Sequence, residues 1–276
     1  MTSVLQKLLH PGMSQLIRER GYSQVGGFVV EAGAARDLST GSTLREAYGV
    51  SPSAEPWVDV VRFALPACAM LSAPPHAERP WPTYPSGFLR PVRSAIVPVW
   101  ILSTTRYSPG AELWRVHDDG RQEFIAAYEG AARGWIAARG VPPVREWHPS
   151  SRYVGTRAVW NGTEYAADVR PGDVEITSYV EPGGDGWVQH RGATWSRTLS
   201  PNECEVYELS FRAALDGVPV RVLEVTGSTV RAQLLTDDPA VAGRLSAVMV
   251  DYGVFEVAGV AGQALTNTQL LANGRG

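Results

Sequence analysis

Hydrophobic and polar positions alternate along two stretches of the chain that resemble each other. Residues 157–162 (RAVWNG) return 55 residues later as residues 212–217 (RAALDG), and the same register holds at Gly172 and Gly227. Alternating residue types, as in Val218–Leu223, predict strands with one buried face. The Asn-Gly and Asp-Gly steps that end the two segments predict tight hairpin turns. The pattern therefore predicts two homologous all-β units.

Each unit is expected to hold four or five short strands in about 55 residues, which is typical of a small SH3-like or Tudor-like barrel. The strands expected in the first copy are 156–160, 163–169, 174–180 and 194–198. The second copy is longer, and its extra residues predict a short helix that begins after Asp238, with Pro239 at the first helical position. The last strand of this copy is expected over 253–257.

The first 150 residues contain patterns typical of helices and patterns typical of strands. Apolar residues at helical spacing predict a helix over 2–9, and further helices are expected over 15–20, ended by Gly21, and over 44–48, with a capping box from Thr43 to Glu46. Strands are expected over 26–31, 57–65, 97–102, 112–116 and 121–128. Residues 71–98 are rich in proline, which favours either an extended segment packed over the domain or a binding loop.

These elements predict an α+β protein with three domains. An N-terminal α+β domain is expected over 1–150, because the proline-containing stretch 141–151 has the composition of a linker. The two tandem barrel repeats are expected over 151–208 and 209–268.

Composition and charge narrow the function classes. The chain has 276 residues, of which 44% are hydrophobic, and two cysteines, Cys68 and Cys204, that fall in different expected domains. It has no apolar run long enough to span a membrane and no convincing signal peptide, so a cytoplasmic protein with reduced thiols is expected. Residues 1–150 carry 15 Lys and Arg against 13 Asp and Glu, whereas residues 151–276 carry 10 against 15. This split argues against nucleic-acid binding. It matches either a basic protein partner or a merely solvated surface.

The sequence shows no established catalytic or metal-binding motif. The five histidines are not spaced as metal ligands, and phosphate-binding and nucleophile-elbow motifs are absent. No catalytic residue, metal or cofactor is therefore predicted. One alternative is an enzyme of the ADP-ribosyltransferase type that uses NAD or a nucleotide, with its site in the N-terminal domain at Arg36, Ser39, Thr40 and Glu46. Glu203 and Glu205 form a Glu-x-Glu pair of the kind those enzymes use, but residues 38–42 also fit the N-cap of a helix.

Surface aromatic and acidic residues are the candidates for partner binding. Trp160, Trp187 and Trp195 can be interpreted either as an aromatic cage for a cation, as in a reader of methylated side chains, or as core residues. A core position for Trp195 predicts a large loss of stability on replacement by alanine. The partner-binding residues expected in the less regular loops are Trp187, His190, Asp237 and Asp238.

Three segments carry a resemblance to a known group of proteins. Residues 110–120 (GAELWRVHDDG), 156–165 (TRAVWNGTEY) and 200–204 (SPNEC) resemble uncharacterised actinobacterial proteins built from paired β-modules. Proteins of this kind resemble the immunity proteins that accompany secreted polymorphic toxins. The resemblance implies a non-enzymatic protein that binds and neutralises a cognate toxin, and it assigns no catalytic residue.

Overall fold

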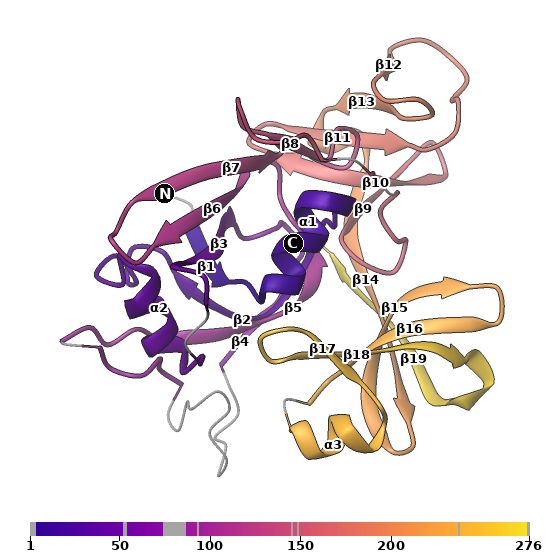
Figure 1. The fold of residues 1–276 in the computed structure, drawn as a ribbon. Coiled ribbons are helices and arrows are strands. Elements are labelled where there is room, and N and C mark those ends of the chain that lie inside the picture. The colour runs from indigo at the N-terminus through magenta and orange to yellow at the C-terminus, as the bar shows by residue number, and fades with distance from the viewer. Residues whose placement is uncertain are drawn as a thin grey trace.

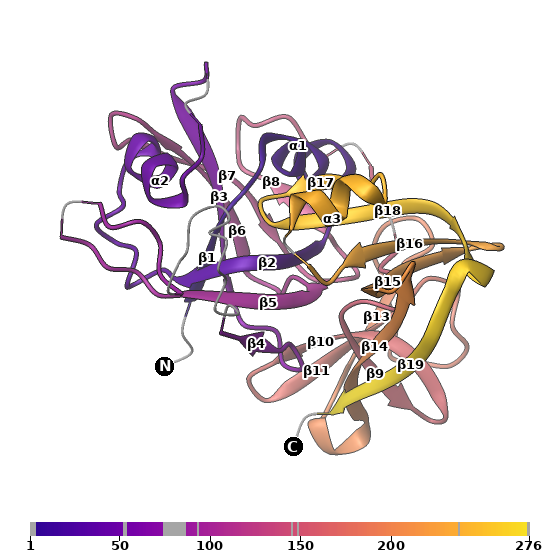
Figure 2. The same cartoon turned by 90° about the horizontal axis from the view of Figure 1, so that it is seen from below.

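The protein is built from two antiparallel sheets that lie side by side (Figure 1, Figure 2). The computed structural model describes residues 4–51, 54–73, 87–92, 94–144, 146–147, 149–236 and 238–274. Strands make up 50% of the structure and helices 12%. The expected α+β character of the N-terminal domain is therefore wrong, because its helices are short additions to a sheet of eight strands.

The N-terminal sheet has the strand order β4-β5-β2-β1-β3-β6-β7-β8. Its strands are β1 (Val4–Leu8), β2 (Gln24–Glu31), β3 (Trp57–Ala64), β4 (Leu71–Ser72), β5 (Val99–Arg106), β6 (Ala111–His117), β7 (Gln122–Tyr128) and β8 (Trp135–Ala137). Helix α1 (Pro11–Arg20) adds Met13 and Ile17 to the hydrophobic core on one face, and α2 (Gly41–Tyr48) adds Leu44 and Tyr48 to the core on the other. A sheet covered on both faces needs apolar residues at neighbouring positions, which weakens the alternation that marks a strand in sequence.

The segment expected as a helix over 2–9 is strand β1 in its described part. It lies between β2 and β3 in the sheet, where Leu5 and Leu8 pack on opposite faces. Its polar residues Gln6 and Lys7 are also buried, and both have partners on other elements. Helical spacing over so short a segment was misleading, because tertiary pairing overrides weak local preference.

The C-terminal sheet contains both copies of the sequence repeat. Its strands are β9 (Thr156–Trp160), β10 (Thr163–Arg170), β11 (Asp173–Ser178), β12 (Val188–Gln189), β13 (Trp195–Leu199), β14 (Glu205–Leu215), β15 (Val218–Thr226), β16 (Thr229–Leu234), β17 (Val248–Asp251), β18 (Val254–Ala261) and β19 (Leu265–Gly274). Helix α3 (Pro239–Arg244) lies between β16 and β17, and short 3-10 turns occur at Pro201–Glu203 and Gly262–Ala264.

The two copies share one strand order. The first runs β9-β10-β11-β13-β12 and the second β14-β15-β16-β18-β17. The expected hairpin turns are present at equivalent positions, with φ of 49° at Asn161 and 73° at Gly162 in the first copy and 48° at Asp216 and 77° at Gly217 in the second. Positive φ at both central residues is the geometry that twisted hairpins favour.

The copies are not the closed SH3-like or Tudor-like barrels that their size suggests. Strand β14 pairs with β9 through residues 205–208 and with β15 through residues 211–215, so one strand continues from the first copy into the second. Strand β19 then pairs with the opposite edge of β14 from Tyr207 to Leu215. A strand shared in this way joins the copies into one open sheet, and neither copy can close on itself.

No helix in the described ranges is long and apolar enough to cross a membrane.

Candidate functional site

Trp187 lies in an aromatic cluster on the first copy of the repeat. Its ring centroid is 6.2 Å from that of Trp160 and 5.5 Å from that of Tyr165, and the cluster packs on the core of β9, β10 and β11. The Arg197 guanidinium lies 4.5 Å from the Trp160 ring centroid. The Arg197 side chain therefore packs on the Trp160 ring, where the aromatic-cage interpretation placed the cation of a ligand. Trp195 lies outside this cluster and is only half-buried, so its expected core position is wrong.

His190 belongs to a polar network beside this cluster. Its Nε2 lies 2.8 Å from Ser196 Oγ, and the Ser196 hydroxyl donates to Glu175 Oε1 at 2.9 Å. Because that hydroxyl proton is directed at Glu175, His190 Nε2 donates to Ser196 and does not act as its base. Burial lowers the pKa of His190, and the nearby Arg133 charge lowers it further. The network is suited to holding β11 and β13 in register, and it lacks an activated serine.

The predicted partner-binding residues do not form one surface. Trp187 and His190 flank β12, whereas Asp238 caps α3 by accepting from Ala240 N at 2.8 Å. Strand β12 and helix α3 lie at opposite ends of the C-terminal sheet (Figure 1). Asp237 lies outside the described residues.

The residues considered for a nucleotide-using enzyme have structural roles or lie on the surface. Thr40 is the N-cap of α2 and shares its capping box with Thr43, so the cap lies three residues before the expected one. Arg36 is exposed beside Asp37, and Ser39 and Glu46 are also exposed. Of the Glu-x-Glu pair, Glu203 accepts from Ser200 N at 2.7 Å as a cap, while Glu205 is exposed at the start of β14.

Three ion pairs, two of them fully buried, join the N-terminal and C-terminal halves of the chain. Lys7 Nζ lies 3.2 Å from Asp251 Oδ2, Arg106 Nη2 lies 3.0 Å from Asp168 Oδ1, and Arg133 Nη2 lies 2.8 Å from Glu175 Oε2. In each pair the cation comes from the N-terminal half and the carboxylate from the C-terminal half. Part of the excess negative charge of the C-terminal half is thus neutralised inside the protein by cations of the N-terminal half. The charge asymmetry itself is visible in the sequence, but the pairing of these particular charges depends on contacts between residues far apart along the chain.

Two glycines allow the sheets to approach each other at this junction. A Cβ added to Gly27 would lie 2.6 Å from Val254 Cγ2, and one added to Gly253 would overlap the Phe28 ring. Both glycines have positive φ, of 80° and 72°. The backbone at these two points leaves no room for a side chain.

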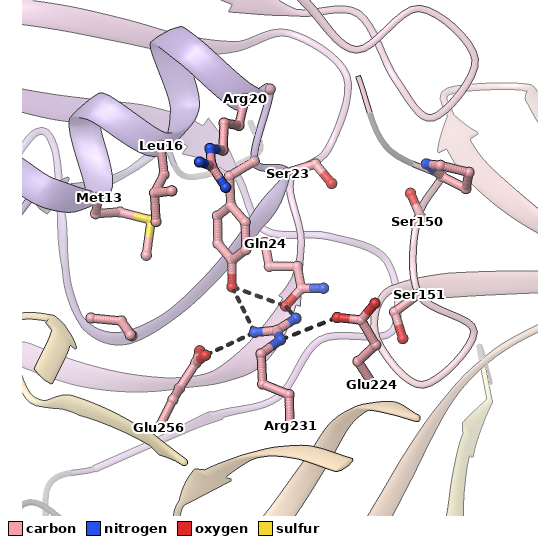
Figure 3. Close-up of a pocket in the computed structure, with 14 residues that line it drawn as sticks. Met13, Leu16, Arg20, Ser23, Gln24, Ser150, Ser151, Glu224, Arg231 and Glu256 are labelled. Atoms are coloured by element: carbon pink, nitrogen blue, oxygen red, sulfur yellow. Dashed lines mark hydrogen bonds and ion pairs between the residues drawn. The ribbon is translucent and has the colours of Figure 1, made fainter. Parts of the chain in front are cut away.

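A cavity of about 600 Å³ opens beside the junction, and Arg231 of β16 lies at its centre (Figure 3). The cavity is lined by residues of α1, β2, β15, β16, β17 and β18 and by the segments 21–23 and 149–151. The Arg231 guanidinium donates to Glu256 Oε2 at 2.8 Å, to Glu224 Oε2 at 3.3 Å and to Gln24 Oε1 at 3.3 Å. It also donates to the Tyr22 hydroxyl at 3.3 Å. All three guanidinium nitrogens of Arg231 thus have acceptors. Two of the acceptors, Tyr22 and Gln24, come from the N-terminal half of the chain.

Burial controls ionisation in this cavity. Burial raises the pKa of Glu256, although the Arg231 charge and hydrogen bond oppose the rise. Burial also raises the pKa of Tyr22, and the Glu256 charge adds to this effect. The Arg231 cluster therefore behaves as a structural link between the sheets, with its charges matched internally.

Glu175, which lies outside this cavity, shows the opposite balance. Its hydrogen bonds from Arg133 and Ser196 outweigh the effect of burial and hold its pKa below the ordinary value.

The outer edge of β19, the edge that does not pair with β14, is a second candidate binding surface. This strand has ten residues, none of them charged, and its exposed side chains include Leu270 and Leu271 on opposite faces. Figure 2 shows it running along the outer side of β14. In the described ranges, β14 is its only pairing partner. Within the part of the chain that the structure describes, the other edge of β19 has no strand paired with it.

Comparison of the chain with protein-family models, curated proteins and solved structures finds no match.

Proposed function

We propose that this chain is a cytoplasmic, non-enzymatic protein-binding protein whose docking surface is the outer edge of β19. The observation that carries the proposal is a long, uncharged and exposed strand edge. Sheet proteins normally protect such edges with short strands, charged residues or proline, because an open edge is a template for pairing with another chain.

The contrast with the other outer strands supports this assignment. β4 and β12 have two residues each, β8 has three and β17 has four, so these edges are short. β19 has ten residues and no charged or proline side chain. The protein thus protects its other edges by the usual device and leaves this one open.

The chemistry of the edge indicates the kind of partner segment. An added strand would gain main-chain hydrogen bonds along β19, and alternate side chains would contact Leu270 on one face and Leu271 on the other. The matching segment is an extended, uncharged strand with apolar side chains. A basic partner is not required, because several carboxylates of the C-terminal half, including Asp168, Glu175 and Asp251, are already paired with cations of the N-terminal half.

The finer form of the proposal is that the partner is a secreted toxin and that docking neutralises it. Its support is the resemblance of residues 110–120, 156–165 and 200–204 to actinobacterial proteins of paired β-modules, which in turn resemble immunity proteins. The natural candidates are proteins encoded beside the gene for this chain.

The experiment measures binding of those neighbouring gene products to the full chain. Complex formation is followed by light scattering after size exclusion, and the contact surface by amide hydrogen exchange. We expect one neighbour to bind and to protect amides within residues 265–274. Leu271→Lys should weaken that complex about tenfold or more, because pairing would desolvate the new charge.

The control is Val248→Lys, which places the same charge at a 65% exposed valine of the edge strand β17. It should leave the affinity unchanged. Protection confined to other segments, or undiminished binding by Leu271→Lys, would overturn the docking site. Self-association through β19 without a partner would also overturn it, and failure of every neighbour to bind would overturn toxin neutralisation.

A further inference from the structure

A second cavity at the junction of the two sheets has an unbalanced positive charge. It measures about 290 Å³ and lies between β2 and β5 of the N-terminal sheet and β14, β15 and β16 of the other. The polar residues that line it are Arg212, Arg221, Ser72, Ser103, Thr104, Gln233 and Thr236. No carboxylate is present among the described residues that line it. Two guanidinium groups therefore share one cavity with hydroxyl and amide groups.

The two arginines are directly opposite each other on neighbouring strands. Arg212 of β14 pairs with Arg221 of β15 in the antiparallel register, so both side chains project from the same face of the sheet. Like charges at such positions are destabilising in the absence of a counter-ion, because the Cβ atoms are only about 4.5–5.5 Å apart. The repulsion contributes to a lowered pKa of Arg221, after the larger effect of burial.

The carboxylate that contacts Arg221, Glu208, already has its hydrogen-bond partners. Glu208 Oε1 accepts from Arg221 Nη2 at 3.0 Å and from Gly155 N at 3.1 Å, and Oε2 accepts from the Thr105 hydroxyl at 2.8 Å. These bonds balance Arg221. Within the described part of the chain, Arg212 has neither an ion pair nor a side-chain hydrogen bond, and its buried Nε atom lacks an acceptor, as does that of Arg221.

We propose that this cavity binds a small organic oxyanion, whose charged group lies between Arg212 and Arg221. Guanidinium groups present planar forks of donors that match phosphate and carboxylate oxygens. The Thr104 hydroxyl already donates to Gln233 Oε1, so Ser72, Ser103 and Thr236 are the hydroxyl residues left as further donors. Phe28, Ile101 and Leu235 supply apolar residues for the body of the ligand. The volume admits a ligand about the size of a substituted benzene ring. The site is separate from the Arg231 cavity and from the outer edge of β19.

The test uses phenyl phosphate and benzoate as probes and benzyl alcohol as a neutral molecule of similar size. Binding to the full chain is measured by calorimetry at constant ionic strength. We expect phenyl phosphate, benzoate or both to bind and benzyl alcohol not to bind, and the stronger of the two probes identifies the oxyanion. Arg212→Gln should weaken binding about tenfold to a hundredfold, the effect of losing charge-assisted hydrogen bonds.

Arg212 is the residue to change, since removing Arg221 would leave Glu208 buried without its cation. The matched control is Arg244→Gln, which removes an exposed arginine from α3 in the same half of the chain. Melting temperature gives a second readout, because the bound oxyanion should raise it in the wild type and much less in Arg212→Gln.

Absence of binding by both oxyanions would overturn the site. Equal binding of benzyl alcohol, or unchanged affinity in Arg212→Gln, would do the same. Leu271→Lys should leave the affinity for the oxyanion unchanged, and Arg212→Gln should leave the affinity for the protein partner unchanged. The two proposals can therefore fail independently.

Discussion

Replacement of Asp168 by alanine is the sharpest test of how the two sheets are joined. The side chains of Asp168 and Arg106 are each 2% exposed, and Asp168 Oδ1 lies 3.0 Å from Arg106 Nη2. Its Oδ2 accepts from Ala131 N at 2.7 Å. One carboxylate of β10 therefore holds a cation of β5 and a backbone amide of the loop after β7.

The expected loss is large because both partners stay buried. Leaving one member of a buried ion pair alone costs about 3–5 kcal/mol. The orphaned Ala131 amide adds up to about 1–3 kcal/mol, although the two effects overlap. We therefore expect Asp168→Ala to lower the free energy of unfolding by about 4 kcal/mol or more, a large fraction of the 5–15 kcal/mol typical of folded proteins.

Urea unfolding followed by tryptophan fluorescence measures this change. The control is Asp37→Ala, since Asp37 is 70% exposed beside Arg36 and its loss should change stability by less than about 0.5 kcal/mol. The double variant Arg106→Leu/Asp168→Leu should recover part of the loss, because it removes both buried charges. If Asp168→Ala lost no more stability than Asp37→Ala, the buried pair would not hold the sheets together.

Two further predictions concern the junction. Gly253→Ala should lose about 1–3 kcal/mol more stability than Gly259→Ala in thermal unfolding, because both glycines have φ near 70° but only the first would press a Cβ into Phe28. Equal losses would show that backbone strain alone matters. The second prediction concerns pH. Because the folded state raises the pKa of Glu256, the contribution of this residue to stability is present below about pH 4.5 and is lost as the pH rises through the folded pKa. Because the folded state lowers the pKa of Glu175, its contribution is present above about pH 4.5 and is lost as the pH falls through the folded pKa. Stability measured against pH for Glu256→Gln and Glu175→Gln should therefore differ from the wild type with opposite slopes, and slopes of one sign would contradict the assigned environments.

Local chemistry made several elements predictable. The hairpin turns at Asn161–Gly162 and Asp216–Gly217, the end of α1 at Gly21 and the cap of α3 at Asp238 all depend on residues within a few positions of one another. The repeat also predicted equivalent strands in the two copies, since the same turns and alternation set the same pairings.

The candidate sites were harder to predict, because they combine residues far apart in sequence. Arg231 collects acceptors from Gln24 and Tyr22, which lie more than 200 positions away. Arg212 and Arg221 each look like an ordinary polar residue of an alternating strand. Only the register of β14 with β15, and the closeness of β5, bring them into one cavity.

By itself, the sequence determined where the chain turns and that one segment was duplicated, because turn geometry and strand alternation are local properties of neighbouring residues. The tertiary structure alone decided that β1 is a strand, that β14 is shared between the copies, and that the acidic half satisfies cations of the basic half. Those outcomes depend on which strands become neighbours, and strand pairing is a competition among distant segments that no single stretch of residues encodes.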